Sequence, residues 1–393
     1  MSGKAKVLGV SMVKFAKPGK HEPYEVMAAK AVKGALEDAG IDYDDVQQAY
    51  ASYVYGDSTC GQTALYQVGM TGIPIINVNN NCSSGSTALY MARQAVESGD
   101  MDCVLAFGFE EMKPGALGSV WDDRTPPMGW AMQRLAEMEP DLPDAPLALK
   151  MFGAGGKAYL EKYGANPDIF AKVAVKSRSH AVNNPYSLFD KPLTVEEVLN
   201  APVLFPTLTR LMACPPTCGA AAVVVCSETF AKKHGLANAV EIIGQAMTTD
   251  TAVSFDHPIA LIGAEMTQRA ALQMYEKAGI GPEDVDVVEL HDCFTPNEVI
   301  TYEGLGLCRE GEAEKFINDG DNSYGGKYVV NPSGGLMSKG HPLGATGLAQ
   351  CTELVWQLRG QANQRQVEGA TIALQHNLGL GGACITTMYR RGL

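Results

Sequence analysis

Apolar runs of strand length alternate with helix-like apolar patterns over most of the chain. In the first 112 residues the pattern predicts strands at 7–10, 73–78 and 103–109, and helices at 24–39 and 84–97. After residue 213 it predicts strands at 219–226, 240–246, 286–290 and 371–374, and helices at 264–278 and 344–358. Strands interleaved with helices predict an α/β fold with a mainly parallel sheet, and the continuous apolar run at 73–78 predicts a buried strand.

The stretch 113–213 breaks this alternation. It holds 11 of the 21 prolines, and its 11 Lys/Arg and 11 Asp/Glu make it neutral in a chain of net charge −13. We therefore predict a loop-rich insertion, where a phosphate-bearing ligand would be repelled least. A solvated lid without any ligand role is the open alternative. The predicted division is a first half at 1–112 and 214–252, the insertion at 113–213, and a second half at 253–393.

The two halves carry a similar segment. Cys82–Leu89 aligns with His341–Leu348, with Gly, Thr and Leu at the fourth, sixth and eighth places of each. Each segment follows a Gly/Asn-rich turn and opens a predicted helix, which favours a duplication. If a pseudo-twofold axis relates the halves, Cys82 and His341 should face each other.

The amino-acid composition limits the classes of protein to which the chain can belong. The 393 residues are 46% hydrophobic and 19% charged, which is typical of a globular protein with large cores. The acidic balance and the lack of a basic stripe argue against nucleic-acid binding. The N-terminus lacks a secretory apolar region, no stretch approaches the roughly 18 apolar residues of a membrane span, and ten irregularly spaced cysteines suggest a reducing compartment. These features predict a cytoplasmic protein without a membrane span.

Cys82 is the first candidate for chemistry. It lies where a predicted strand passes through three asparagines into a predicted helix. A helix N-terminus favours thiolate over thiol, and a strand-to-helix turn exposes one side chain as a nucleophile. A buried, inert cysteine is the alternative. The pair Cys214 and Cys218 has no second pair beside it, so we predict no metal site.

Two further segments supply candidate partners. Pro342 suits a first helical turn, which would place His341 at or beside a helix cap as a base for the Cys82 thiol. A capping histidine without a catalytic role is the alternative. His291 and Cys293 follow a predicted strand and lie two residues apart, so both can face one cavity. A donor for a carbonyl oxygen and a proton shuttle are the roles that such a pair can fill.

These segments together resemble the thiolase family over nearly the whole chain, and most of all its sterol carrier protein 2-type members. The carrying motifs are Asn-Asn-Asn-Cys82-Ser-Ser-Gly-Ser, His291-Asp-Cys293-Phe, Gly340-His341-Pro-Leu-Gly-Ala-Thr-Gly and Gln375-His-Asn-Leu-Gly. The resemblance implies two similar α/β halves in a five-layered αβαβα sandwich with an inserted loop domain. It also implies homodimers, sometimes paired into tetramers.

The resemblance further implies roles for single residues. Cys82 falls on the acylated nucleophile and His341 on its base, while His291 falls where most thiolases have an asparagine that positions a water of the oxyanion hole. Most thiolases carry a second catalytic cysteine in a C-terminal Cys-x-Gly motif; here that place reads Leu378-Gly-Leu, which puts the acid/base role on Cys293.

Two more residues fall on elements that bind the substrate. The glycine-rich turn with Gly381 offers backbone N–H groups to an oxyanion. Met151 falls on an element that lines the acyl pocket.

The function that follows is that of a 3-ketoacyl-CoA thiolase, which cleaves 3-oxoacyl-CoA with coenzyme A through an acyl-cysteine. Coenzyme A is then a substrate, and no cofactor is bound. The alternatives are a biosynthetic acetyl-CoA acetyltransferase, another enzyme on the same scaffold such as a ketoacyl synthase or retro-aldolase, and a non-catalytic acyl-CoA or lipid carrier.

Overall fold

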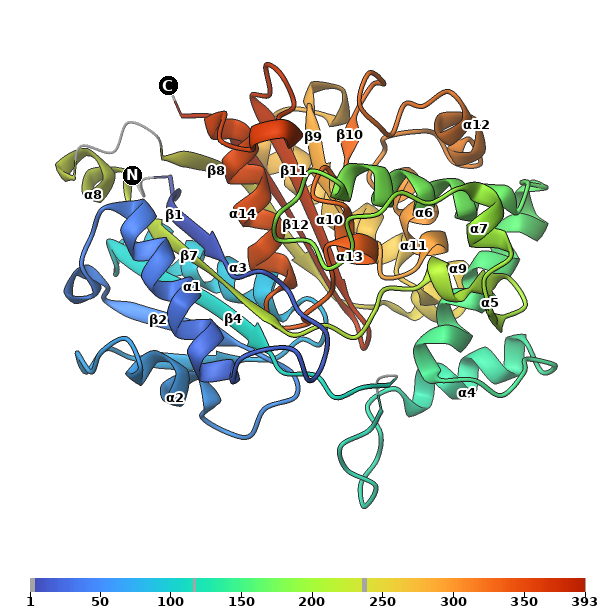
Figure 1. Ribbon diagram of the computed structural model, residues 1–393, viewed down its shortest axis with the longest axis horizontal. Helices are drawn as coiled ribbons and strands as arrows, with labels where there is room; N and C mark the ends of the chain where they lie inside the picture. Colours follow the sequence, from blue (N-terminus) through green and yellow to red (C-terminus); the bar gives the residue numbers. More distant parts are fainter. Residues whose placement is uncertain (1–3, 116–117, 235–238, 393) are drawn as a thin grey trace.

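A computed structural model describes residues 4–115, 118–234 and 239–392 (Figure 1). Positions 116 and 117 of the predicted insertion therefore lie outside the described residues. The described strands of the main sheet are β1 Lys6–Met12, β2 Gln48–Ser52, β3 Ile75–Val78, β4 Cys103–Glu110, β7 Gly219–Cys226, β8 Val240–Thr248, β9 Val287–Glu289, β10 Val329–Val330, β11 Ile372–Gly379 and β12 Ala383–Arg390.

The described helices follow the same alternation. They are α1 Tyr24–Ala39, α2 Cys60–Tyr66, α3 Ser84–Glu97, α4 Gly129–Met138, α5 Leu147–Tyr163, α6 Asp168–Ala181, α7 Val195–Leu199, α8 Glu228–Lys233, α9 Pro258–Leu261, α10 Ala264–Ala278, α11 Thr295–Gly304, α12 Ala313–Asn318, α13 Gly335–Ser338 and α14 Thr346–Arg359. Among the described residues, no helix combines the length and apolar character needed to cross a bilayer.

The sheet is two five-stranded halves joined edge to edge. Its strand order is β10-β9-β11-β12-β8-β1-β7-β4-β2-β3. Counted along the chain within each half, both halves have the order third, second, fourth, fifth, first. The halves meet at β1 and β8 through only two register pairs, Lys6 with Glu241 and Val7 with Val240. The common order supports the predicted relation between the halves.

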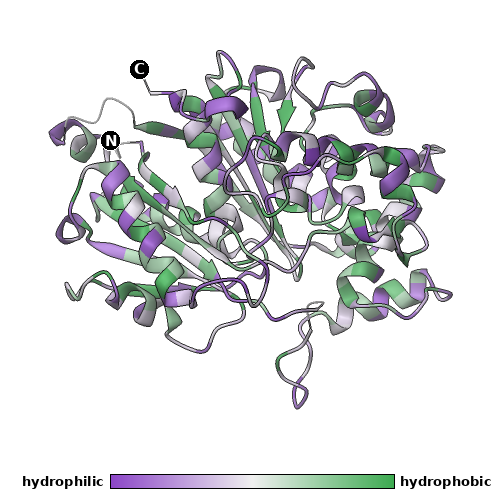
Figure 2. Ribbon diagram, viewed as in Figure 1, coloured by the Kyte–Doolittle hydropathy of each residue, from purple (hydrophilic) through white to green (hydrophobic). Residues whose placement is uncertain are grey.

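The prediction of a mainly parallel sheet is wrong. The outer three strands of each half are parallel, whereas β7 and β12 run antiparallel to both of their neighbours. An apolar run records burial but carries no sign of strand direction. The central strand β7 is buried at every position, and Figure 2 shows the hydrophobic colour along it.

Helices α3 and α14 form the middle layer between the two half-sheets. They contact each other and strands of both halves, while α1 packs on the outer face of β1 and β7 and α10 on that of β8 and β12 (Figure 1). The result is the expected α/β sandwich of five layers. Gly85 permits the close crossing of the middle helices, since a Cβ there would lie 2.9 Å from the Gly344 carbonyl oxygen.

Three further predicted features of the fold differ from the structure. Strand β3 was predicted to be buried, but it lies at the edge of the sheet with Ile76 37% exposed. The stretch 113–213 is more helical than predicted, because it forms α4 to α7 and a small sheet of β5 Val203–Phe205 and β6 Leu208–Thr209. Strand β8 pairs with β12 along its length, so it groups with the second half and not, as the predicted boundary at 252 implied, with the first.

Candidate active site

Cys82 lies on a sharp turn between β3 and α3. The preceding Asn81 has the left-handed φ of 51°, which asparagine tolerates better than most residues. The Asn81 side chain donates to the Leu380 carbonyl oxygen at 3.1 Å, and so ties this turn to the loop after β11. Ser83 is the helix cap, so Cys82 precedes the helix and is 5% exposed. The turn thus presents the thiol to the interior of the protein.

The predicted preference of Cys82 for the thiolate is not found in the free protein. Burial and the nearby Glu110 raise the pKa of Cys82 to about 12, although the N–H groups of Cys82 and Leu380 act in the other direction. Desolvation penalises the charged form more than the helix terminus rewards it. Cys82 is therefore a thiol near neutral pH and needs a base to become a nucleophile.

His341 lies in the turn before α14. Its backbone N–H donates to the Thr217 hydroxyl at 3.1 Å, and Gly340 before it has a φ of 117° that favours glycine. The helix begins at Thr346, so His341 is not at its cap as predicted. Pro342 instead closes the turn, because its carbonyl accepts the N–H groups of Ala345 and Thr346.

The hydrogen bonds of His341 fix which ring nitrogen is protonated. Its Nδ1 lies 2.7 Å from the Thr346 hydroxyl, which donates its own hydrogen to the Pro342 carbonyl at 3.0 Å. The hydroxyl must therefore accept from Nδ1–H. Burial lowers the pKa of His341 to about 3, so the ring is neutral and Nε2 carries a lone pair without a hydrogen-bond partner. His341 is thus equipped to accept a proton.

His291 follows β9 and is held on three sides. The Asn377 side-chain nitrogen lies 3.0 Å from His291 Nδ1, the His291 N–H donates to His376 Nδ1 at 3.3 Å, and its carbonyl accepts from the Asn297 amide. Burial, together with the nearby His341 and His376, lowers the pKa of His291 well below its usual value. The ring is therefore also neutral.

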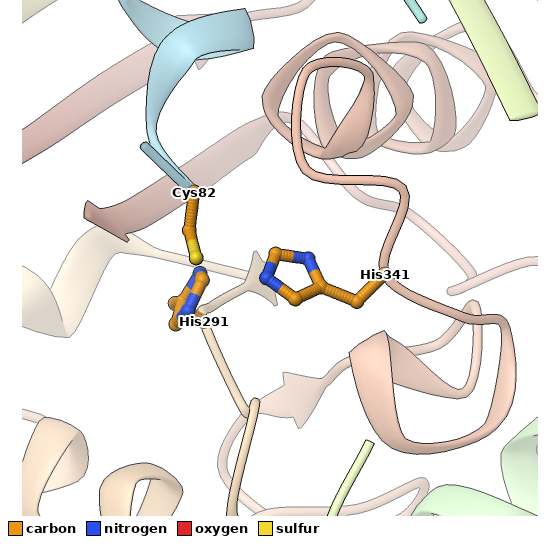
Figure 3. A group of neighbouring side chains, drawn as sticks. All are labelled: Cys82, His291 and His341. Carbon is orange, nitrogen blue, oxygen red and sulfur yellow. The ribbon is translucent and has the colours of Figure 1, made fainter. Parts of the chain in front are cut away.

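The structure brings Cys82, His291 and His341 together, as the internal repeat predicted for the first and last of them. Their ligand atoms lie within 4.8 Å of one another, and the two imidazoles meet edge to face with centroids 5.0 Å apart (Figure 3). Thiolate and imidazole are also zinc ligands, but among the described residues the group has these three members. The prediction of no metal stays a prediction.

Cys293 lies beside this group with a cysteine that sequence reasoning set aside. The Cys214 N–H donates to the Cys293 carbonyl at 2.9 Å, and the Phe294 ring stacks on Phe152 of α5. Burial, followed by the nearby Cys214, Cys82 and Asp292, raises the pKa of Cys293 well above its usual value. Cys293 is thus a neutral thiol near Cys82. Cys214 lies beside Cys293 because Ala213 pairs with Phe294 in the folded protein, a contact that the sequence does not show.

A cavity of about 490 Å³ adjoins the Cys82 turn. Its lining includes Met128, Trp130, Met151, Phe255, Leu380 and Gly381. Met151 and Gly381 therefore share one cavity. Of the two backbone N–H groups that lower the pKa of Cys82, the one from this loop belongs to Leu380, the residue before Gly381. The wall contributed by Met128, Trp130 and Phe255 was not recognised from the sequence, because Met128 and Trp130 lie at the start of α4 and Phe255 lies in the short helix Ala252–Phe255, far away in the chain.

Glu110 links the two halves beneath the site. Its carboxylate accepts from the backbone of Val54 at 3.1 Å, Tyr55 at 2.9 Å and Gly344 at 3.0 Å. The Ser52 hydroxyl donates to the Gly344 carbonyl at 2.7 Å. Residues of the first half thereby hold the turn of the second half that carries His341.

Two family models match, one described as thiolase, N-terminal domain over residues 7–229 and one as thiolase C-terminal domain-like over residues 246–389. Sterol carrier protein 2 from Oryctolagus cuniculus is 54% identical over 392 residues, covering 98% of this chain and 72% of that protein.

Two solved structures share the fold. An Ltp2-ChsH2(DUF35) aldolase matches with a TM-score of 0.83 at 24% identity, covering 99% of this chain and 98% of that one. Human mitochondrial 3-ketoacyl-CoA thiolase matches with a TM-score of 0.75 at 19% identity, covering 100% and 99%.

Proposed function

Because the chain belongs to the thiolase family, we propose that it is a 3-ketoacyl-CoA thiolase that works through an acyl group on Cys82. The observation that carries this proposal is the grouping of the Cys82 thiol with two neutral histidines within 4.8 Å. A thiol with its pKa raised to about 12 gains reactivity only when a neighbouring base accepts its proton. His341 has the free lone pair that this step requires.

The first half-reaction forms the acyl-enzyme. The Cys82 proton moves to His341 Nε2, and the thiolate attacks the 3-keto carbon of a 3-oxoacyl-CoA. The resulting oxyanion accepts hydrogen bonds from His341 and His291. When it collapses, the bond between carbons 2 and 3 breaks, and Cys293 protonates the departing acetyl-CoA enolate at carbon 2. Backbone N–H groups of Cys82 and the Gly379–Gly382 turn hold the thioester oxygen.

The second half-reaction returns every proton. The Cys293 thiolate accepts the proton of an incoming coenzyme A, whose sulfur attacks the acyl carbon on Cys82. Collapse of this intermediate releases the Cys82 thiolate, which takes back the proton held on His341. The shortened acyl-CoA leaves with no net change in the enzyme. The same steps in reverse describe the biosynthetic acetyltransferase, and plentiful coenzyme A favours thiolysis.

Trapping the acyl group tests this function. With a 3-oxoacyl-CoA and no free coenzyme A, we expect one shortened acyl group on the peptide with Cys82 by mass spectrometry, and one equivalent of acetyl-CoA released. Added coenzyme A should then remove the label. A Cys60→Ala variant, which lacks another buried cysteine, should label normally. Binding of the substrate without any covalent label would show a carrier and contradict the proposal.

Thr346 offers a test of the base. Thr346→Val keeps the shape of the side chain but removes the hydroxyl that fixes the hydrogen on His341 Nδ1. We expect kcat for acetoacetyl-CoA thiolysis to fall about 5- to 10-fold, since one hydrogen bond contributes about 1–1.4 kcal/mol. Thr346→Ser keeps the hydroxyl and should stay near the wild-type rate. Equal rates for the two variants would show that the Thr346 hydroxyl does not help His341 to act as the base.

Met151 and the apolar cavity wall are proposed to hold the acyl chain. Coenzyme A is proposed as a substrate, with no bound cofactor. A homodimer, with tetramers as the alternative, and a cytoplasmic location also remain predictions.

A further inference from the structure

A chain of buried polar side chains leads from the middle layer to His291. Gln375 and Asn377 lie two residues apart on β11, and Ser86 lies on α3, one helical turn after Cys82. All three side chains are completely buried. Buried polar groups are retained in a protein only with their hydrogen bonds made, so the direction of each bond can be followed.

The direction of the chain is set by a backbone carbonyl. The Gln375 side-chain nitrogen lies 2.6 Å from the Gly347 carbonyl oxygen of α14, which can only accept. The Tyr389 hydroxyl donates to the other end of the same amide. The amide therefore cannot be turned around, and its nitrogen also donates to the Ser86 hydroxyl at 2.9 Å.

The remaining hydrogens follow from this anchor. Ser86 accepts from Gln375 and donates its own hydrogen to the Asn377 side-chain oxygen at 2.9 Å. The Asn377 nitrogen is then the end that faces His291 Nδ1 at 3.0 Å, and it donates. A neutral imidazole that accepts at Nδ1 carries its hydrogen on Nε2.

We propose that Gln375, Ser86 and Asn377 act as positioning residues that fix His291 with its hydrogen on Nε2. His341 is fixed in the opposite form by Thr346, with its lone pair on Nε2. The hydrogen bonds to Thr346 and Asn377 thus give the two histidines beside Cys82 different roles. His341 accepts the thiol proton, and His291 donates to the oxyanion. The consequence for rate rests on the proposed function, whereas the position of the hydrogen does not.

The ligand-free protein tests the position of the hydrogen directly. With ¹⁵N-labelled histidine, NMR distinguishes the two neutral forms and the protonated ring, and His291→Asn assigns the signal. We expect a neutral ring protonated on Nε2 between pH 6 and 8. A ring protonated on Nδ1, or a charged ring, would overturn the proposal whether or not the chain is a thiolase.

Asn377→Asp tests the same point by replacing the donor with a carboxylate, which can only accept. The Nδ1 of His291 must then gain a hydrogen, so the NMR signal should change and a histidine ionisation should appear in the pH profile of kcat. Asn200→Asp makes the same charge change on the exposed end of α7 and should leave both readouts as in the wild type. An unchanged signal and profile in Asn377→Asp would contradict the positioning role.

Asn377→Leu tests the effect on rate. Without the donor, the His291 hydrogen is free to occupy either nitrogen. We expect kcat to fall about 100-fold with little change in KM, as for loss of one oxyanion donor. Ser86→Ala, a smaller change, should give two His291 forms by NMR and an intermediate kcat. If the wild-type signal is as expected but both variants keep the wild-type kcat, the positioning role fails while the thiolase proposal stands.

Discussion

Replacing Cys82 with alanine is expected to lower the rate of acetoacetyl-CoA thiolysis by about 10⁴-fold or more. The variant loses the atom that holds the acyl group, and among the described residues no other thiol belongs to the group with His291 and His341. Residual turnover would come from substrate binding and the remaining hydrogen-bond donors. The removed sulfur is small, so the fold should persist, which circular dichroism and thermal unfolding can verify. Steady-state kinetics with purified protein measures the effect.

The control for Cys82→Ala is a cysteine of similar burial outside the group. Cys384 lies on β12 against Thr267, and Cys384→Ala should keep thiolysis within a few-fold of wild type. Wild-type turnover by Cys82→Ala would remove the nucleophile from the mechanism. If the Cys82→Ala variant forms no trapped acyl peptide, its thiolysis activity is lost in the first half-reaction.

Cys293→Ala is expected to reduce thiolysis by about 10³-fold, since a positioned acid or base contributes roughly 10²–10⁴-fold. The enolate of acetyl-CoA then has no proton donor at carbon 2. The neighbouring Cys214 is the thiol best placed to substitute, so the double variant Cys214→Ala/Cys293→Ala shows whether any residual rate depends on it.

A proton-exchange measurement separates Cys293 from Cys82. In heavy water, a base beside carbon 2 exchanges the methyl hydrogens of bound acetyl-CoA for deuterium. We expect Cys82→Ala to retain slow exchange through the small fraction of Cys293 that is ionised, and Cys293→Ala to lose it, as read by mass spectrometry of acetyl-CoA. Exchange at the wild-type rate in Cys293→Ala would assign the acid/base role to another group.

The pattern of the sequence predicts single elements well. Helices at Tyr24–Ala39 and Ala264–Ala278 were predicted with their observed bounds, because each ends at a glycine in the left-handed conformation. The proline-rich stretch was misjudged for a physical reason. Pro146 and Pro167 stand at the N-terminal caps of α5 and α6, where a missing N–H costs nothing, so these prolines begin helices.

The hydrophobic pattern of the sequence could not predict which strands lie beside a given strand or in which direction they run. The apolar residues of β3 resemble those of a buried strand, yet no strand among the residues that the structure describes pairs on the outer side of β3. Burial of that face depends on neighbours that the local sequence does not describe. The antiparallel course of β7 and β12 is hidden for the same reason.

At the candidate site, too, the sequence predicted features that depend on local segments but not those that depend on the tertiary structure. The match between two short segments predicted that Cys82 and His341 face each other, because a pseudo-twofold axis places equivalent turns together. The state of the Cys82 thiol was predicted wrongly from the helix terminus, since burial is a property of the whole fold. The partners Thr346 and Asn377 could not be identified, because their importance lies in hydrogen-bond direction and not in spacing.

The short junction between β1 and β8 has a consequence for the thermal inactivation of the protein. Two register pairs, the hydrogen bond from the Ile242 N–H to the Ala5 carbonyl and the Lys4–Glu241 ion pair join the half-sheets there, while Cys82 and His341 belong to opposite halves. A slight opening of this seam would separate nucleophile and base while every strand and helix stayed formed. The crossing of α3 and α14, the packing of α14 on β7 and β1, and the hydrogen bond from the Gly344 N–H to Glu110 then hold the two halves together. We therefore expect thermal inactivation to begin as loss of alignment between two intact halves, so that thiolysis is lost at a lower temperature than the helical signal in circular dichroism.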